Sequence, residues 1–110
     1  MYDQREIVLI PFPYSDLTGS KQRPALIISN SRLNKTDDRI CVLITSNKPK
    51  DGLLIKSNTV VNGSLSFKSW VKPHRIFTVD KRIIKKRLCV ISNVFHNEII
   101  DSLNSYIKEN

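Results

Sequence analysis

The sequence predicts a mainly β protein, a small barrel with one helix at its C-terminal end. Most of the chain consists of short β-branched runs separated by turn residues, a pattern typical of strands. These runs are apolar almost throughout, which indicates burial on both faces, as in a small closed barrel. Only the last stretch changes to helical spacing. We therefore expect one β core with a helix packed on it.

The strand candidates share an apolar, β-branched composition and are bounded by turn residues. The loops between them include YSDLTGSKQ, SRLNKTDD, SNKPKDG and SNTVVNGS, the second of which is compatible with a short helical turn. Pro11 and Pro13 have no amide hydrogen, so the first strand should end or lie at an edge there and release a loop from Tyr14 to Gln22. The predicted strands are Glu6–Phe12, Pro24–Ser29, Arg39–Thr45, Leu53–Lys56, Ser66–Val71, Ile76–Val79 and Leu88–Ile91.

The final segment, SNVFHNEIIDSLNSYIKEN, predicts a single helix. Ser92 or Asn93 is suited to its N-cap, and His96 is expected on its polar side, at the surface. The expected apolar stripe consists of Val94, Ile99, Leu103 and Ile107, widened by Phe95, Ile100 and Tyr106.

Length and apolar content set the class of protein. A chain of 110 residues, 40% hydrophobic and 25% charged, fits one domain spanning residues 1–110. Its longest apolar runs are far shorter than the roughly 20 residues of a membrane helix. The N-terminus lacks the basic-then-apolar order of a secretory signal, so we expect no membrane association and a cytoplasmic location.

Charge and cysteine usage narrow the chemistry. Eighteen Lys and Arg against ten Asp and Glu give a net charge of +8, which attracts polyanions and favours nucleic acid as a partner. A merely basic protein, or one that binds an acidic protein, remains an alternative. Cys41 and Cys89 lie in apolar runs and are expected as buried hydrophobes rather than as a disulfide or zinc site. We expect neither a metal nor a cofactor.

Polar residues gather where two predicted strands meet. If Pro24–Ser29 and Arg39–Thr45 pair as antiparallel neighbours, Arg23 faces Thr45. The adjoining loops bring Ser20, Lys21 and Gln22, and Ser46, Asn47 and Lys48, to the same rim. A guanidinium and a hydroxyl can stabilise charge that builds on a phosphodiester. Taken singly, Arg23 also suits a surface salt bridge to Asp16, and Thr45 suits a strand end.

Two segments carry a recognisable pattern, EIVLIPFPYSDLTGSKQRPALIISN near the N-terminus and ICVLITSN in the middle of the chain. In matching order they resemble the N-terminal signature and the second motif of the PemK/MazF group of toxins from type II toxin–antitoxin modules. The similarity continues through FTVDKRIIKKRLCVIS into the final helix. It implies an SH3-like barrel of the CcdB/PemK type, usually a homodimer, that acts as a metal-independent endoribonuclease on single-stranded RNA at short motifs. It also implies an acidic antitoxin that covers the site.

The resemblance assigns roles to individual residues. The arginine of Arg-Pro and the threonine of the second motif form the catalytic pair in that family, and they correspond to Arg23 and Thr45. Attack by a 2′-hydroxyl would leave a 2′,3′-cyclic phosphate and a 5′-hydroxyl. A guanidinium is a poor base, so we assign Arg23 to the pentacoordinate phosphate and Thr45 to a non-bridging oxygen. The group that takes the 2′-proton stays open.

Other residues are candidates for RNA contact. An imidazole suits acid–base work at neutral pH, but a surface histidine after Pro73 is the favoured interpretation of His74. Trp70 and Phe77 could stack on bases, although core positions are favoured for both, and Tyr14 in its loop is the better platform. The basic run from Lys81 to Arg87 is interpreted first as a solvated edge. The expected RNA-binding residues are Tyr14, Asp16, Thr18, Ser20, Lys21, Gln22, Ser46, Asn47, Lys48 and His74.

The chain also departs from the family pattern. Arg5-Glu6 stands where the family usually has Gly-Asp before the first strand, and a common glycine near Cys89 is missing. Both departures concern turns or packing. Three alternatives remain: a non-catalytic CcdB-like toxin that poisons DNA gyrase, an inactive member that binds only RNA or antitoxin, and a basic SH3-like adaptor for proline-rich peptides.

Overall fold

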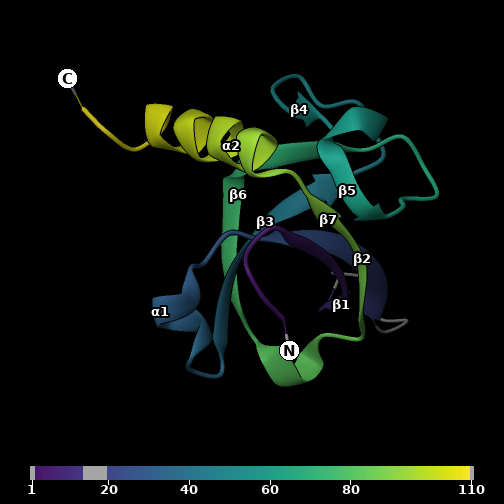
Figure 1. Ribbon diagram of the computed structural model, residues 1–110, viewed down its shortest axis with the longest axis vertical. Helices are drawn as coiled ribbons and strands as arrows, with labels where there is room; N and C mark the ends of the chain where they lie inside the picture. The colour runs from purple at the N-terminus through teal and green to yellow at the C-terminus, as the bar shows by residue number, and fades with distance from the viewer. Residues whose placement is uncertain (1, 14–19, 110) are drawn as a thin grey trace.

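A curled antiparallel sheet with a helix at one end makes up the fold (Figure 1). The computed structural model describes residues 2–13 and 20–109. Within these residues the sheet has seven strands in the order β4-β6-β3-β2-β1-β7-β5, so β4 and β5 are its edges. The mainly β class with a C-terminal helix is confirmed, and the sheet curls as a half-barrel.

The elements follow the chain without long gaps. The strands are β1 (Glu6–Pro13), β2 (Ser20–Ile27), β3 (Asp38–Thr45), β4 (Leu53–Leu54), β5 (Val60–Gly63), β6 (Trp70–Asp80) and β7 (Lys86–Ile91). The helices are α1 (Ser31–Asn34) and α2 (Asn93–Ser105), with 3-10 turns η1 (Ser57–Thr59) and η2 (Lys81–Ile83).

Two apolar clusters lie on opposite faces of the central strands. Alternate side chains of β1, β2 and β3 enter each cluster, which explains why these strands are apolar at nearly every position. The cluster under α2 contains Ile7, Leu26, Val42, Ile44, Val71, Cys89, Ile91, Phe95 and Ile99. The cluster inside the curl contains Val8, Ile10, Ala25, Ile27, Cys41 and Ile84. Both cysteines are buried and free, as expected.

The two prolines of β1 lie on a locally unpaired edge. Pairing of β1 with β7 ends at Leu9, whereas pairing with β2 continues to Pro13 opposite Ser20. Proline therefore removes no ladder bond to β7. The predicted edge is confirmed, but the strand continues through both prolines, and Lys21 and Gln22 belong to β2 rather than to a loop.

The middle of the chain differs most from the sequence interpretation. The predicted strands Ser66–Val71 and Ile76–Val79 form parts of one strand, β6, which begins only at Trp70. Its register against β3 jumps from Ile76 to Lys72, so Pro73, His74 and Arg75 form a bulge. The predicted strand Leu53–Lys56 shortens to two residues, and one further backbone hydrogen bond, from Ile55 N to Ser69 O, continues its pairing toward the start of β6.

A strand lies in a segment interpreted as a loop. β5 occupies part of SNTVVNGS and pairs with β7 through Val60–Ile91 and Gly63–Cys89. Asn-Gly is a strong turn signal, and Gly63 does adopt a positive φ of 76°. The turn signal is therefore correct, but it marks the end of a short edge strand.

The C-terminal helix is confirmed, with Ser92 as its N-cap accepting from the amide of Phe95. Its buried face contains Phe95, His96, Ile99 and Leu103. The first residue of the buried face is Phe95 rather than the expected Val94. Phe95 lies in the core, and Val94 is exposed to solvent. His96, expected at the surface, is buried at 3% exposure, while Tyr106 and Ile107 follow the end of the helix and are exposed. None of the described helices is long and apolar enough to cross a membrane.

Candidate functional site

Arg23 and Thr45 come from neighbouring strands. Arg23 lies on β2 opposite Ile10 of β1, and Thr45 is the last residue of β3. The β2–β3 ladder pairs Ile27 with Cys41 and Ala25 with Leu43. Continued by two residues, this register aligns Arg23 with Thr45, as expected for an antiparallel pair. The two residues then share one face of the sheet, because cross-strand partners point to the same side.

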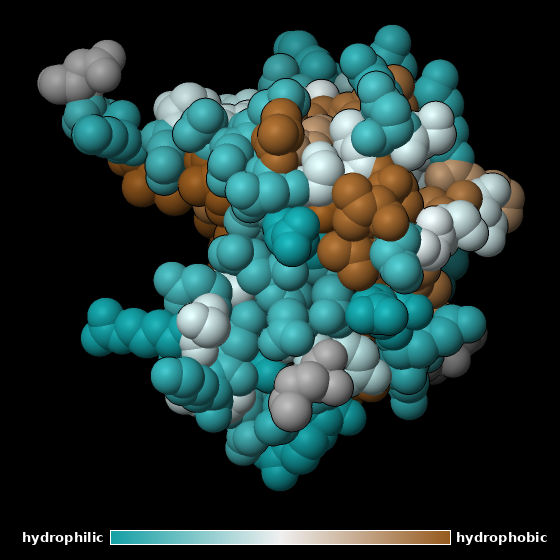
Figure 2. Space-filling model, in the orientation of Figure 1, coloured by the Kyte–Doolittle hydropathy of each residue, from teal (hydrophilic) through white to brown (hydrophobic). Residues whose placement is uncertain are grey.

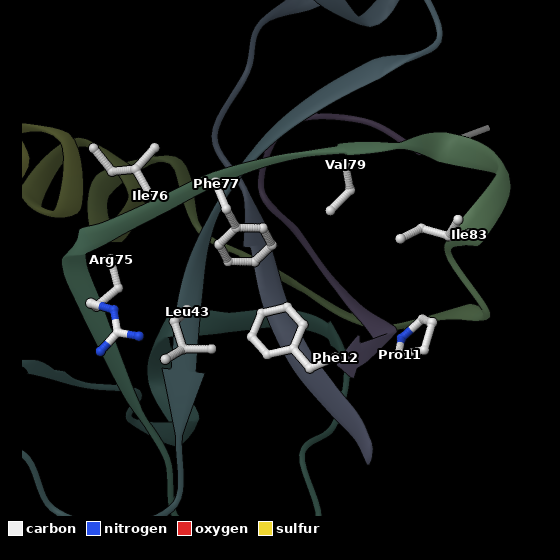
Figure 3. Close-up of a pocket in the computed structure, with 8 residues that line it drawn as sticks. All are labelled: Pro11, Phe12, Leu43, Arg75, Ile76, Phe77, Val79 and Ile83. Carbon is white, nitrogen blue, oxygen red and sulfur yellow. The ribbon is translucent and has the colours of Figure 1, made fainter. Parts of the chain in front are cut away.

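This face carries an open apolar cavity (Figure 3). Leu43 and Phe12 contribute to it from β3 and β1, at alternate positions from Thr45 and from the Arg23 partner Ile10. Phe12 packs edge-on against Phe77 of β6, with ring centroids 5.0 Å apart. The cavity measures about 370 Å³, and Arg75 contributes its guanidinium to the lining. A cation beside an apolar wall suits a ligand with both an anionic and an aromatic part.

The Thr45 hydroxyl is held by the turn that follows β3. The backbone N–H of Asn47 donates to Thr45 Oγ1 at 3.1 Å. The Thr45 hydroxyl in turn donates to the backbone carbonyl of Asn47, at the longer distance of 3.4 Å. The second contact is at the long end for a hydroxyl hydrogen bond, so it exchanges readily for a better acceptor. Ser46, Asn47 and Lys48 are exposed beside it, as the sequence predicts for that loop.

The other predicted RNA contacts divide into three groups. Lys21 and Gln22 are exposed on β2, opposite Phe12 and Pro11. The backbone of Ser20 begins the same strand opposite Pro13. Tyr14, Asp16 and Thr18, together with the proposed Arg23–Asp16 salt bridge, lie outside the described residues.

His74 lies in the β6 bulge rather than in the row of Arg23 and Thr45. Its imidazole is exposed and its centroid is 5.3 Å from that of the Tyr106 ring beyond α2. Leu43, two residues before Thr45, pairs with Lys72 on the other side of the bulge. The expectation of a surface histidine is therefore confirmed.

The described polar groups of Arg23 and Thr45 suit charge stabilisation, and the two thiols of the chain are buried in the core. Burial raises the pKa of Cys41 to about 12 and that of Cys89 to about 11, so both thiols stay protonated. In the part of the chain that the structure describes, no cluster of His, Cys, Asp and Glu has the arrangement of a metal site. The guanidinium of Arg23 and the hydroxyl of Thr45 are donors suited to an anionic oxygen.

Sequence reasoning missed the cavity residues beside the pair. Phe12 and Leu43 were assigned to strands only, and Arg75 was not singled out. The available signal was the Pro-Phe-Pro run, since a strand edge flanked by prolines leaves its aromatic side chain partly uncovered. Arg75 carried no such signal, because its position depends on the β6 bulge.

Fold and charge together define a small basic β protein with a curled antiparallel sheet and a C-terminal helix, in which Arg23 and Thr45 lie on neighbouring strands. The profile of the PemK-like, MazF-like toxins of type II toxin–antitoxin systems matches residues 3–107. The chain therefore belongs to this toxin family. A comparison with curated proteins gave no match.

Solved structures with the same fold include several toxins. A MazE–MazF complex from Deinococcus radiodurans is similar with a TM-score of 0.74 and 18% identity, over 99% of this chain and 97% of that one. An endoribonuclease in complex with its cognate antitoxin, from a mycobacterial species, gives a TM-score of 0.68 and 21% identity over all of both chains. The Mycobacterium tuberculosis toxin MazF-mt6 gives 0.71 and 15%, over 92% and 94%.

Proposed function

We propose that this toxin is a metal-independent endoribonuclease that cleaves single-stranded RNA at short sequence motifs. Family membership supports the toxin class, and neighbours of the same fold that are endoribonucleases support the reaction. The observation that carries the proposal is the β2–β3 register, which, continued by two residues beyond Ala25–Leu43, brings Arg23 opposite Thr45 on one face of the sheet. A guanidinium and a hydroxyl on one face are donors suited to the non-bridging oxygens of a phosphodiester.

In the proposed reaction the RNA supplies its own nucleophile. The 2′-oxygen attacks the adjacent phosphorus, its proton passes to a base, and the bond to the 5′-oxygen breaks. Arg23 stabilises the negative charge of the pentacoordinate phosphate, and Thr45 donates to a non-bridging oxygen. The products are a 2′,3′-cyclic phosphate and a 5′-hydroxyl. No step calls for a metal, and the identity of the base stays open.

The flanking polar side chains are proposed to bind the rest of the RNA. Lys21 and Lys48 supply exposed charge on either side of the pair, while Gln22, Ser46 and Asn47 supply hydrogen-bonding groups. Backbone charge sets affinity, and amides and hydroxyls read base edges. We expect the sequence motif to be read by these residues and by Tyr14, Asp16 and Thr18.

Two protein partners are also proposed. An acidic antitoxin fits the net charge of +8 and the family's genetic organisation. Its association rate should fall as salt rises, and a rate independent of salt would count against electrostatic steering. A homodimer is proposed from the exposed apolar side chains of Tyr106 and Ile107, which follow the C-terminal end of α2.

Cleavage in a chelator tests the catalytic proposal. Purified protein is incubated with single-stranded RNA in excess EDTA, and the product ends are identified by mass. We expect cleavage with 2′,3′-cyclic phosphate ends, and a loss of about 10²-fold or more in Arg23→Ala. Arg23→Lys should recover only part of the rate, because an ammonium cannot form the bidentate contact.

A matched control separates chemistry from charge. Lys35→Ala removes one exposed cation next to α1, at the other end of the β2–β3 pair, and should leave cleavage nearly unchanged. Unchanged cleavage in Arg23→Ala, at an unchanged melting temperature, would remove Arg23 from the mechanism. Inhibition of gyrase supercoiling without RNA cleavage would instead favour the CcdB-like alternative.

A further inference from the structure

One aromatic side chain lies in the same cross-strand row as Thr45. Trp70 begins β6 and pairs with Thr45 of β3 on one side and with Leu54 of β4 on the other. Cross-strand partners point to the same face, so the row from Arg23 through Thr45 continues to Trp70. Adjacent strands lie about 4.8 Å apart, so the indole is one strand removed from the proposed catalytic hydroxyl.

The indole is accessible and has a cation beside it. Trp70 is half-buried, unlike the fully buried core position that its apolar run suggested. The exposed Lys68 holds its Nζ 5.8 Å from the centroid of the Trp70 ring. Lys68 also lines a second cavity of about 310 Å³, together with Lys56 and Phe67, and Phe67 is 76% exposed.

We propose that Trp70 and Lys68 form a binding subsite for the nucleotide next to the cleaved bond. The base of that nucleotide stacks on the indole, and Lys68 pairs with its phosphate. The RNA strand then continues toward the second cavity, which Phe67 lines. This inference rests on the proposed RNA cleavage, to which it adds the path of the substrate.

Stacking of a base on the indole is stronger than the contact that the ring makes with Lys68. A cation–π contact at an exposed site contributes less to binding than the stacking of a base on an aromatic side chain. Lys68 is exposed and flexible, so the base displaces its ammonium from the ring at small cost. The ammonium of Lys68 then lies near the phosphates of the RNA, where a positive charge contributes most to binding.

The combination of aromatic and cationic side chains favours RNA over an apolar protein surface as the occupant. The described lining of the second cavity contains Lys56 and Lys68 and no Asp or Glu. Aromatic groups interleaved with cations and hydroxyls are typical of surfaces that bind single-stranded nucleic acid. An apolar protein interface would instead be depleted in lysine at its centre.

Fluorescence provides a direct test, because Trp70 is the single tryptophan of the chain. An oligonucleotide carrying 2′-deoxy sugars cannot be cleaved, and its binding is measured by anisotropy of a label at its end. We expect intrinsic fluorescence to be quenched in step with binding, and Lys68→Gln to weaken affinity several-fold. Lys35→Gln, a matched cation at the other end of the β2–β3 pair, should bind like the wild type.

The outcomes are separable from those of the proposed function. Binding without a change in Trp70 emission, or equal affinity in Lys68→Gln and Lys35→Gln, would overturn the subsite. Absence of both binding and cleavage would overturn the proposed function itself. Quenching by an antitoxin peptide but not by oligonucleotide would assign the surface to a protein partner and reject the subsite.

An abasic scan locates the nucleotide. Cleavage is measured on RNAs that lack one base at each position flanking the cleaved bond. We expect one position at which base removal slows wild-type cleavage about tenfold and has little effect in Trp70→Leu. Trp70→Phe, which keeps an aromatic face, should recover sensitivity at that position. Equal sensitivity in wild type and Trp70→Leu, with melting temperatures unchanged, would overturn the proposal.

Discussion

The hydroxyl of Thr45 lies at the point where β3 leaves the sheet, and the turn that follows fixes its direction. The amide of Asn47 donates to Oγ1, which leaves the hydroxyl proton with only the long contact to Asn47 O. A phosphate oxygen is a stronger acceptor than a carbonyl and would take that proton. The backbone of the turn therefore orients the Thr45 hydroxyl, and its proton is available to a stronger acceptor.

Two near-isosteric changes isolate this hydroxyl. Thr45→Val keeps the β-branched shape but removes the donor, so we expect cleavage to fall about 10²-fold while the melting temperature changes little. Thr45→Ser keeps the hydroxyl and should retain most activity. Steady-state cleavage rates and thermal melts check both variants. Equal rates for Thr45→Val and the wild type would exclude Thr45 from catalysis.

His96 shows where a helical pattern fails to place a polar residue. It follows Phe95, and the buried face of α2 includes both positions. Its Nε2 is buried without a hydrogen-bond partner among the described residues. Burial lowers the pKa of His96 below its usual 6.5, and the positive charge of Arg5 lowers it further. The folded protein therefore holds this imidazole neutral.

The buried neutral imidazole of His96 should make the folded protein less stable as the pH falls. The unfolded chain takes up the proton near the usual pKa, whereas the folded chain takes it up only at lower pH. The contribution to stability is thus complete above about pH 6.5 and is lost as the pH falls through the lowered pKa. We expect the melting temperature of the wild type to fall more than that of His96→Leu between about pH 7.5 and about pH 5.5.

The comparison of the wild type with His96→Leu isolates this imidazole. Parallel pH profiles for the two proteins would show that His96 does not titrate differently on folding. Glu6 does not affect the comparison, since its buried carboxyl is common to both proteins.

At the scale of elements, the entry to β1 depends on an arginine in an unusual conformation. Arg5 has φ of +77°, the left-handed region that favours glycine. Its amide donates to Ile27 O, and its carbonyl accepts from Ile91, so this conformation joins the ends of β2 and β7. The position is the one where the sequence departs from the Gly-Asp of similar toxins. That departure therefore carries backbone strain.

Substitution at Arg5 measures this strain. Arg5→Gly and Arg5→Ala both lose the contact from Arg5 Nη1 to Ile91 O, so that loss cancels between them. A left-handed non-glycine residue costs roughly 1–2 kcal/mol, partly offset by the greater freedom of glycine in the unfolded chain. We expect Arg5→Gly to be about 1 kcal/mol more stable than Arg5→Ala in denaturant unfolding. Equal stability would indicate that the backbone relaxes at this position.

Elements with strong local signals were predictable, and those defined by partners were not. The apolar runs of β1, β2 and β3 and the cap and spacing of α2 follow directly from the sequence. β5 has only four residues and ends in the turn signal Asn-Gly, and its strand conformation depends on pairing with β7. The β6 bulge depends on β3 in the same way. Pairing over a long range leaves little trace in local composition.

The site followed the same division. The adjacency of the strands that carry Arg23 and Thr45 was predictable because β2 and β3 are strong apolar strands that follow one another in sequence. Arg39 was assigned only to a strand start, yet it is fully buried and donates to the carbonyls of Tyr2, Thr36 and Asp38. An arginine that holds three carbonyls looks the same in sequence as one in solvent. Trp70 lies opposite Thr45 because of the register between β6 and β3, which the sequence does not reveal.

The whole molecule exposes apolar side chains at one end of α2. Tyr106 and Ile107 are 52% and 63% exposed, and Ile76 of β6 is 43% exposed on the strand whose His74 contacts Tyr106. Figure 2 shows hydrophobic residues along the underside of α2, next to a recess in the surface. Apolar side chains grouped in this way favour a subunit interface.

Light scattering tests the dimer. We expect a mass near twice the 12.7 kDa of the chain at micromolar concentration, and a shift toward the monomer in Ile107→Glu. Val61→Glu is the matched control, since Val61 is 59% exposed on β5, away from the end of α2 in Figure 1. A wild-type mass of one chain would contradict the dimer, and equal shifts in both variants would place the interface elsewhere.

The order of the strands also has a bearing on when the toxin becomes dangerous to the cell that makes it. β1, the first strand to leave the ribosome, needs β7 as its neighbour, and β7 is the last strand to be synthesised. A nascent chain that stops before Lys86 lacks both that strand and the helix that covers one cluster. Nearly the whole chain must therefore be synthesised before the sheet that carries Arg23 and Thr45 is complete, so an antitoxin made at the same time would have that interval in which to appear.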